Sequence, residues 1–205
     1  MHAIIDQPDR HTALGQRDHG LLLFLYNTGA RISEALAVRC ADLHLTPPRP
    51  VRLHGKGRKD RLCPLWPETT QALQCLPAVR NNAPGNFIFV NRQGEPLTRD
   101  GVDYLLRKYV TAAIPTAPTL QRRKITPHVL RHSCAVALLQ SGVDITVIRD
   151  YLGHASVATT SRYLTTNLQM KRAALEAFWE RAGITPVNAT PWQPSPDLLT
   201  FLASL

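Results

Sequence analysis

The chain of 205 residues has the length of one ordinary domain, and a domain of that size buries roughly 70% of its unfolded surface. It carries 24 Lys and Arg against 15 Asp and Glu, a formal charge of +9, which favours a polyanionic partner. No apolar run reaches the ~18 residues that span a bilayer, and no signal-peptide pattern opens the chain, so we expect a cytoplasmic protein without a membrane partner.

The first predicted helix follows a short polar segment. Residues 1–17 are polar and contain several turn residues, so we expect them to form an N-terminal extension. From Asp18 to Asn27 the apolar residues are nearly continuous, which predicts a helix that is buried on most sides. Gly29 ends this helix.

A second helix is predicted directly after Gly29. Its opening turn contains Arg31, beside free backbone N–H groups and a partial positive charge that together favour phosphate. On this segment alone the alternative is a simple ion pair between Arg31 and Glu34, which lies off the apolar stripe. The stripe itself consists of Ile32, Ala35 and Leu36.

Residues 47–65 predict a β-hairpin around the turn HGKGRKDR. The apolar residues that flank this turn are Val51, Leu53, Leu62 and Leu65. The predicted tip carries basic side chains that could enter a DNA groove, namely Lys56, Arg58, Lys59 and Arg61. The alternative is a solvated basic turn without a partner.

The middle of the chain predicts a helix over 67–76, a short strand over 87–90 and a helix over 98–112. The following segment, 114–124, is rich in Pro and Thr and is predicted to be a loop. It ends in a basic cluster that we expect to contact the phosphate backbone of DNA: Arg122, Arg123 and Lys124.

Clear helix signals begin at Thr126, a favourable N-cap residue, which is followed by a proline at the first helical position. The helix is predicted to end at Gly142. Asp144 then caps a second helix over 145–152, which Gly153 closes.

Four side chains of this stretch have functional groups that suit a phosphodiester better than a peptide or a sugar. His128 and Arg131 are three residues apart and share a helix face. His154 follows the closing glycine, and Tyr163 comes nine residues later.

The end of the chain predicts a helix over 168–182, a linker with four prolines, and a short amphipathic helix over 196–205. We therefore expect a main domain over 18–183 and a linker with a C-terminal helix over 184–205. The predicted fold class is mainly α with a small antiparallel β-sheet.

The four cysteines show no paired spacing and are expected to be buried and reduced: Cys40, Cys63, Cys75 and Cys134.

Phosphodiester transfer without a metal needs a nucleophile, cationic donors and an acid for the leaving oxygen. Tyr163 can be the nucleophile, although only about 0.1% of a phenol with a pKa of about 10 is ionised at pH 7, so nearby cations must help. Arg31 and Arg131 can each give two charge-assisted hydrogen bonds to phosphate oxygens. Three further side chains can donate to the phosphate or transfer protons: His154, Lys56 and His128.

Each of these residues has an ordinary alternative interpretation. His128, His132 and His154 could be metal ligands, but carboxylates or thiolates at short spacing are missing, so we predict no metal site. A histidine after a helix-ending glycine is often a turn residue, and a single tyrosine such as Tyr163 is usually a packed or surface side chain.

Four blocks of the chain together resemble the tyrosine recombinase (phage integrase) family. They occur in the family's order and at similar separations, over about residues 18–180: TGARISEAL, HGKGRKDR, TPHVLRHS and LGHASVATTSRYL. The resemblance implies the catalytic-domain fold of that family, and site-specific DNA recombination through a 3′-phosphotyrosine and a Holliday junction. It implies no cofactor and no metal.

The resemblance also implies residue roles and partners. Lys56 is the expected general acid and Tyr163 the expected nucleophile, while the expected ligands of the scissile phosphate are Arg31, His128, Arg131 and His154. The expected partners are double-stranded DNA and further protomers in a tetrameric synapse. The C-terminal helix is a candidate contact between protomers, and its docking in cis is the equal alternative. The N-terminal core-binding domain usual in the family is expected to be absent.

Two other activities are compatible with the same residues. A type IB topoisomerase-like enzyme would use the same tyrosine chemistry to relax DNA supercoils. A non-catalytic DNA-binding remnant would not depend on Tyr163.

Overall fold

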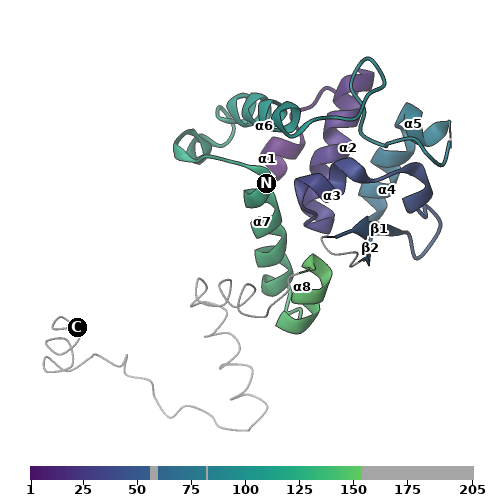
Figure 1. The fold of residues 1–205 in the computed structure, drawn as a ribbon. Helices are drawn as coiled ribbons and strands as arrows, with labels where there is room; N and C mark the ends of the chain where they lie inside the picture. Colours follow the sequence, from purple (N-terminus) through teal and green to yellow (C-terminus); the bar gives the residue numbers. More distant parts are fainter. Residues whose placement is uncertain (56–59, 82, 154–205) are drawn as a thin grey trace, which may run out of the picture. The chain divides into compact units, whose positions relative to one another are not determined.

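The structure, a computed structural model, describes residues 1–55, 60–81 and 83–153. Residues Met1–Thr165 form one compact unit, and Thr166–Leu205 form a second unit that lies outside the described residues, together with the helices and linker predicted there. The described part is mainly helical with one small antiparallel sheet, which confirms the predicted fold class (Figure 1). None of its helices is long and apolar enough to cross a membrane.

The core is built around α2 (Ala13–Thr28), which packs against helices on two sides. Thr12 is its N-cap, and the threonine hydroxyl accepts a hydrogen bond from the backbone N–H of Gly15 at 3.0 Å. The helix therefore begins at Ala13 and not at Asp18 as predicted. Its buried apolar side chains are Leu21, Leu22, Phe24 and Leu25.

A short helix precedes α2 inside the segment predicted as an extension. This helix, α1 (His2–Ile5), places Ile4 and Ile5 in the same hydrophobic core as α2, with each side chain about 1% exposed. Burying an isoleucine stabilises a fold by about 1.5–3 kcal/mol, so this segment contributes to the stability of the core. A pair of apolar residues among polar ones is too short a pattern to predict this.

The predicted hairpin is present. β1 (Pro50–His54) pairs antiparallel with β2 (Asp60–Pro64). Its buried face differs from the prediction, because Leu62 is 60% exposed. Side chains alternate along a strand, and the register pairs Val51 with Cys63 and Leu53 with Arg61 on the inner face. Short helical segments before the hairpin are α3 (Ile32–Ala37) and η1 (Cys40–Asp42).

Two short helices follow the hairpin, α4 (Pro67–Gln74) and α5 (Pro77–Arg80). The strand predicted over 87–90 was wrong: this segment forms only isolated bridges, between Arg39 and Phe87 and between Val90 and Pro96. It still reaches the core, because the Phe89 ring packs edge-to-face against Phe24 with centroids 5.5 Å apart.

The remaining helices follow their predicted end signals closely. They are α6 (Arg99–Ala113), α7 (Pro127–Gln140) and α8 (Ile145–Leu152), with the short turn η2 (Pro118–Arg122) inside the predicted loop. Thr98, Thr126 and Asp144 are the N-caps, each with a side-chain oxygen that accepts a backbone N–H of the first turn. Helix α2 contacts α7, and α8 contacts both α7 and β2.

Cysteine burial agrees with the prediction at three of the four positions. Cys40, Cys63 and Cys134 are buried and Cys75 is exposed, and all four are free thiols. Burial raises the pKa of the Cys134 thiol to about 12, which keeps this sulfur neutral.

The strand pair next to the hairpin turn holds a histidine between two carboxylates. His54 lies at the end of β1, and its ring nitrogens are 3.0 Å from carboxylate oxygens of Asp60 on β2 and of Asp42 in η1. The hydrogen bond with Asp60, and then that with Asp42, raise the pKa of His54 above its ordinary value of 6.5. The protonated imidazole therefore stabilises the end of the hairpin that lies next to its turn.

We expect His54→Gln to lower the free energy of unfolding by about 0.5 kcal/mol at pH 6, because the site is largely exposed and screened by solvent. A raised native pKa gives a contribution that is complete below pH 6.5 and is lost as the pH rises through the native pKa. The variant and the wild type should thus converge near pH 9 in urea unfolding. His44→Gln, a change of an exposed histidine just before β1, is the control. A difference for His54→Gln that is equal at both pH values would contradict the assignment.

Candidate active site

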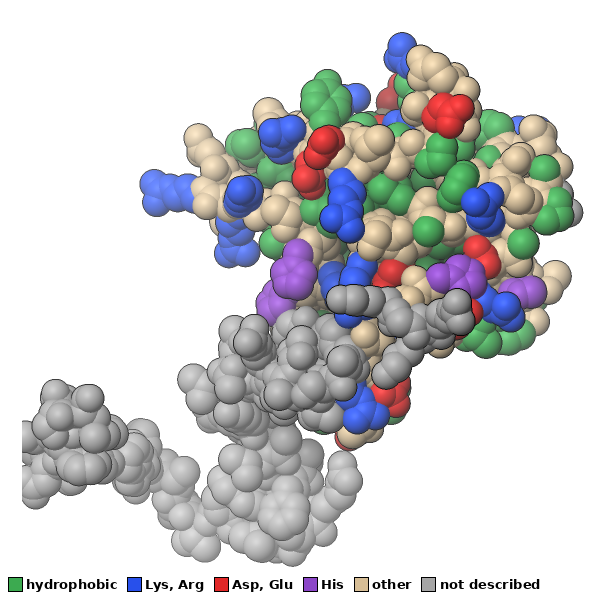
Figure 2. Space-filling model, viewed as in Figure 1, with side chains coloured by type: hydrophobic (Ala, Val, Ile, Leu, Met, Phe, Trp, Pro, Cys, Tyr) green, Lys and Arg blue, Asp and Glu red, His purple; other side chains and the backbone are tan. Residues whose placement is uncertain are grey.

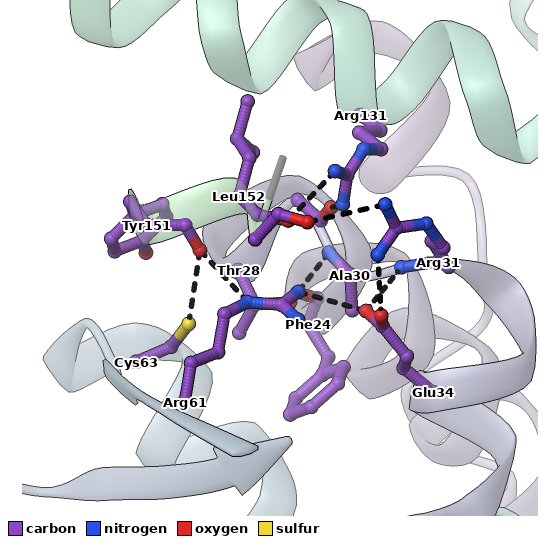
Figure 3. A network of polar contacts seen from close by, with 12 residues as sticks. Phe24, Thr28, Ala30, Arg31, Glu34, Arg61, Cys63, Arg131, Tyr151 and Leu152 are labelled. Carbon is purple, nitrogen blue, oxygen red and sulfur yellow. Dashed lines mark hydrogen bonds and ion pairs between the residues drawn. The ribbon is translucent and has the colours of Figure 1, made fainter. Parts of the chain in front are cut away.

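A buried carboxylate lies at the centre of the polar network in Figure 3. Glu34 is the third residue of α3, and its side chain is only 4% exposed. Its Oε1 accepts a hydrogen bond from Nη1 of Arg31 at 2.7 Å, and its Oε2 accepts one from Nη2 of Arg61 at 2.8 Å. Burial alone would raise the pKa of Glu34, but hydrogen bonds from Arg61 and from the backbone of Arg31 lower it, so the carboxylate is charged.

Arg31 is the N-cap residue of α3, and Glu34 fixes it twice. The same carboxylate that binds its guanidinium also accepts its backbone N–H at 3.0 Å, as in a capping box. The side chain of Arg31 remains 44% exposed. The ion pair with Glu34, given above as the simple alternative for this segment, is therefore present, and it holds an accessible guanidinium in one place.

Three arginines converge on the C-terminal end of α8. Arg61 donates through Nε to the carbonyl of Tyr151 at 2.9 Å, Arg131 through Nη2 to that of Leu152 at 2.7 Å, and Arg31 through Nη2 to that of Gly153 at 3.2 Å. The last carbonyls of a helix lack partners within the helix and carry partial negative charge, so they attract cations. Three consecutive carbonyls thus align three guanidinium groups from three separate elements.

The closing residue of α8 fits this arrangement because it has no side chain. Gly153 has φ of 65°, in the left-handed region that favours glycine. A Cβ atom at this position would lie 3.0 Å from Nη1 of Arg61. The guanidinium of Arg61 therefore packs directly against the backbone from which the chain continues to residue 154.

Arg131 lies on α7 and is buried, with 4% of its surface exposed. Besides the carbonyl of Leu152, it donates through Nη1 to the carbonyl of Gly29 at 2.5 Å. Gly29 has φ of 56°, and a Cβ there would come within 2.4 Å of the Leu152 side chain. This glycine lets the end of α2 approach the end of α8 closely enough for one guanidinium to join them.

Hydrogen bonds behind the arginines hold the network against the core. The Tyr151 hydroxyl donates to the carbonyl of Asn27 at 2.7 Å, and the Asn27 side chain accepts the backbone N–H of Trp66 at 2.8 Å. The Cys63 thiol lies 3.6 Å from the carbonyl of Tyr151. The turn after α2 is fixed by Thr28, whose hydroxyl donates to Phe24 and accepts from the N–H of Ala30.

The structure brings together two of the six residues predicted to be catalytic, Arg31 and Arg131. His128 is exposed in the first turn of α7, three residues before Arg131. The other three predicted residues lie outside the described residues: Lys56, His154 and Tyr163. The alternative of a metal site on His128, His132 and His154 includes one of them and stays untested.

The residues predicted to contact DNA fall into two groups. Arg122, Arg123 and Lys124 are exposed around the end of η2. Figure 2 shows Lys and Arg side chains gathered at the left edge of the described face, where Figure 1 draws the connection between α6 and α7. The second group comes from the hairpin. Arg61 was predicted to enter a DNA groove, but its side chain is only 10% exposed and lies in the polar network. Arg58 and Lys59 lie outside the described residues.

The sequence interpretation missed Glu34 and Arg61 as parts of the site. A signal for Arg61 was present in the strand, where alternation places it on the same face as Cys63. Glu34 could have been recognised as the third residue of a helix beginning after Arg31, where a carboxylate commonly binds the N-cap backbone. The described network contains three guanidinium groups and one carboxylate, so it carries excess positive charge and suits an anion.

Comparisons with known proteins identify relatives of this chain. A family model described as "Phage integrase family" matches residues 1–171. The chain is 38% identical over 203 residues to a putative integrase/recombinase, y4rC, of Sinorhizobium fredii, covering 99% of this chain and 60% of that protein. It is 35% identical over 189 residues to the tyrosine recombinase XerC of Bacillus licheniformis, covering 89% of this chain and 60% of that protein.

Among solved structures, the XerH site-specific recombinase bound to its difH substrate, in a pre-cleavage complex, is similar to this chain with a TM-score of 0.67. The two are 28% identical, and the match covers 83% of this chain and 48% of that chain. The chain spans about 60% of the length of the two curated relatives named above.

Proposed function

The chain belongs to the phage integrase family, and from this premise we propose that it is the catalytic part of a site-specific DNA recombinase of the tyrosine type, acting in the cytoplasm. In this proposal Tyr163 attacks the scissile phosphate and forms a 3′-phosphotyrosine, while the 5′ oxygen leaves as a hydroxyl. A 5′-hydroxyl of a second strand then reverses the bond and yields a Holliday junction. Because the phosphotyrosine conserves the energy of the phosphodiester, the cycle calls for neither ATP nor a metal.

The observation that carries the proposal is the convergence of Arg31 and Arg131. They come from elements a hundred residues apart in sequence, and they donate to the adjacent carbonyls of Gly153 and Leu152. Guanidinium groups fixed in this way can each place two donors on the non-bridging oxygens of a phosphate as charge develops there. The exposed side of Arg31 gives the DNA strand access.

Other residues complete the proposed mechanism. Lys56 protonates the departing 5′ oxygen, His154 donates to the phosphate, and His128 assists proton transfer near Tyr163. The exposed basic residues of η2 contact the DNA backbone outside the cleavage site, namely Arg122, Arg123 and Lys124, and Arg58 and Lys59 do so from the hairpin.

The proposed partners are double-stranded DNA and further copies of the chain in a tetrameric synapse. A XerH recombinase with the same fold is bound to its DNA substrate, which supports this choice of ligand. In the proposal the catalytic domain ends near residue 183, and the helix at 196–205 is a candidate contact between protomers.

Covalent trapping tests the proposed function. The protein is mixed with nicked duplex oligonucleotides of randomised sequence, from which the cleaved end diffuses away, and the products are separated on denaturing gels. We expect a DNA-linked protein, and after trypsin digestion a nucleotide remnant on the peptide 163–171. Sequencing the trapped DNA identifies the preferred site.

The experiment is repeated with a core-binding domain fused before residue 1, because the relatives are longer than this chain. Absence of any adduct in both forms, or an adduct on another peptide, would overturn the proposal. Relaxation of any supercoiled plasmid without site preference would favour a topoisomerase-like activity instead.

A further inference from the structure

One arginine of the network has no place in the proposed chemistry. Arg61 follows the hairpin tip on β2, and its guanidinium joins three elements. It binds Glu34 of α3 at 2.8 Å and the carbonyl of Tyr151 at the end of α8 at 2.9 Å, and it packs against Gly153. All three nitrogens of its guanidinium lie against the protein, because Nε and Nη2 donate to these two acceptors and Nη1 faces Gly153.

Stability alone does not account for this arrangement. A buried ion pair loses so much hydration that apolar residues of similar volume often stabilise a fold equally well. Leu53, which pairs with Arg61 across the hairpin, is fully buried and shows that this face of the sheet accommodates apolar side chains. Unlike an apolar side chain, the guanidinium of Arg61 holds its two acceptors, the Glu34 carboxylate and the Tyr151 carbonyl, in fixed positions.

Both side-chain hydrogen bonds of Arg31 depend on groups that Arg61 also holds. Arg61 occupies Oε2 of Glu34, which directs the other oxygen, Oε1, toward Nη1 of Arg31. Arg61 also anchors the carbonyl of Tyr151, two residues before the Gly153 carbonyl that accepts from Nη2 of Arg31. Without Arg61, Oε2 of Glu34 keeps only the backbone N–H of Arg31 as a donor, so the carboxylate is held less firmly, and the last turn of α8 loses a cationic partner.

We propose that Arg61 is a positioning residue that holds Arg31 toward the scissile phosphate, acting through Glu34 and the C-terminal turn of α8 and never touching the DNA. This inference rests on the proposed function. It assigns to a residue of the basic hairpin a role inside the protein in place of a contact with the groove.

The test uses the DNA sequence recovered by covalent trapping, in two chemical forms. One duplex has the normal phosphodiester at the cleavage position, and the other has a methylphosphonate, in which a methyl group replaces one non-bridging oxygen and removes the charge. Arginines that stabilise charge on these oxygens matter less for the neutral substrate. A defect that acts through Arg31 should therefore shrink on the methylphosphonate.

We expect Arg61→Met to lower the single-turnover cleavage rate of the phosphodiester by about 100-fold, the effect of misplacing a catalytic group by about 1 Å. On the methylphosphonate the rate should fall by about threefold or less. Arg52→Met is the matched control, because Arg52 is an exposed arginine on the partner strand β1, and both of its rates should stay at wild-type values. Equal defects of Arg61→Met on the two substrates, or no defect, would overturn the inference.

A double-variant cycle keeps the inference testable even if Arg61→Met folds less well. If Arg61 acts through Glu34, the variant with both Arg61→Met and Glu34→Gln should cleave no more slowly than the slower single variant. Defects that multiply would mean independent roles and would overturn the inference. A wild-type chain that forms no adduct either alone or with the fused core-binding domain would instead overturn the proposed function, on which the inference depends.

Discussion

Tyr163→Phe is expected to abolish covalent attachment to DNA, with a fall in cleavage rate of at least about 10³-fold, because the change removes the attacking oxygen and little else. Binding of the uncleaved duplex should be unchanged, since the arginines proposed to hold the phosphate do not require the phenol. Cleavage is measured in single turnover with the trapped duplex, and binding by fluorescence anisotropy. A covalent product from Tyr163→Phe would place the nucleophile at another residue.

The other four tyrosines supply the control for this prediction. Burial raises the pKa of Tyr26, Tyr109 and Tyr151, and the hydroxyls of the last two donate to Asp18 and to the backbone of Asn27. These phenols are poor nucleophiles in the folded chain. Tyr104 on α6 is 62% exposed, so Tyr104→Phe is the matched variant and should cleave like the wild type.

The helix ends that flank the site were predictable from local chemistry. Thr126 and Asp144 cap their helices with their own side chains, and Gly153 closes α8 in the left-handed conformation. These signals lie within a few residues of the structure they determine. Gly29 likewise ends α2 in the left-handed conformation that glycine favours. The sequence therefore correctly places Arg31 at the start of the next helix.

What the sequence did not predict are partnerships over long distances. The Asp18 carboxylate is buried between its neighbour Arg17, with which it forms an ion pair, and Tyr109, far along the chain, which donates to it at 2.7 Å. Arg61 lies in a basic run that is typical of an exposed turn, and only the carboxylate of Glu34 and the end of α8 decide that it is buried. Local propensity carries no information about such partners, so a charged residue is assigned to the surface by default.

The network joins described residues from all four recognised blocks of sequence. Arg31 comes from the first block and Arg131 from the third, and the carbonyls they share come from residues 152–153, where the fourth block begins. Arg61 adds the second block through β2. The end of α8 is therefore the common acceptor that sets the positions of guanidinium groups from the other three blocks.

Arg131→Met is the second prediction with a large effect, and it combines loss of stability with loss of activity. Arg131 is buried, and its removal leaves the carbonyls of Gly29 and Leu152 without their cationic donor. An unsatisfied buried acceptor costs about 1–3 kcal/mol, so we expect the free energy of unfolding to fall by about 3 kcal/mol in urea denaturation. Cleavage per folded molecule should fall about 10³-fold, because the proposed donor to the phosphate is lost as well.

Arg131→Lys separates the two effects. An ammonium keeps the charge but cannot span two carbonyls and a phosphate as a planar guanidinium does, so we expect a smaller loss of stability with nearly the full loss of cleavage. Arg80→Met, at an exposed arginine of α5, is the control and should stay within about 0.5 kcal/mol of the wild type. Wild-type cleavage by Arg131→Lys would show that this arginine joins the ends of α2 and α8 without binding the scissile phosphate, and the phosphate would then depend on Arg31 and the histidines.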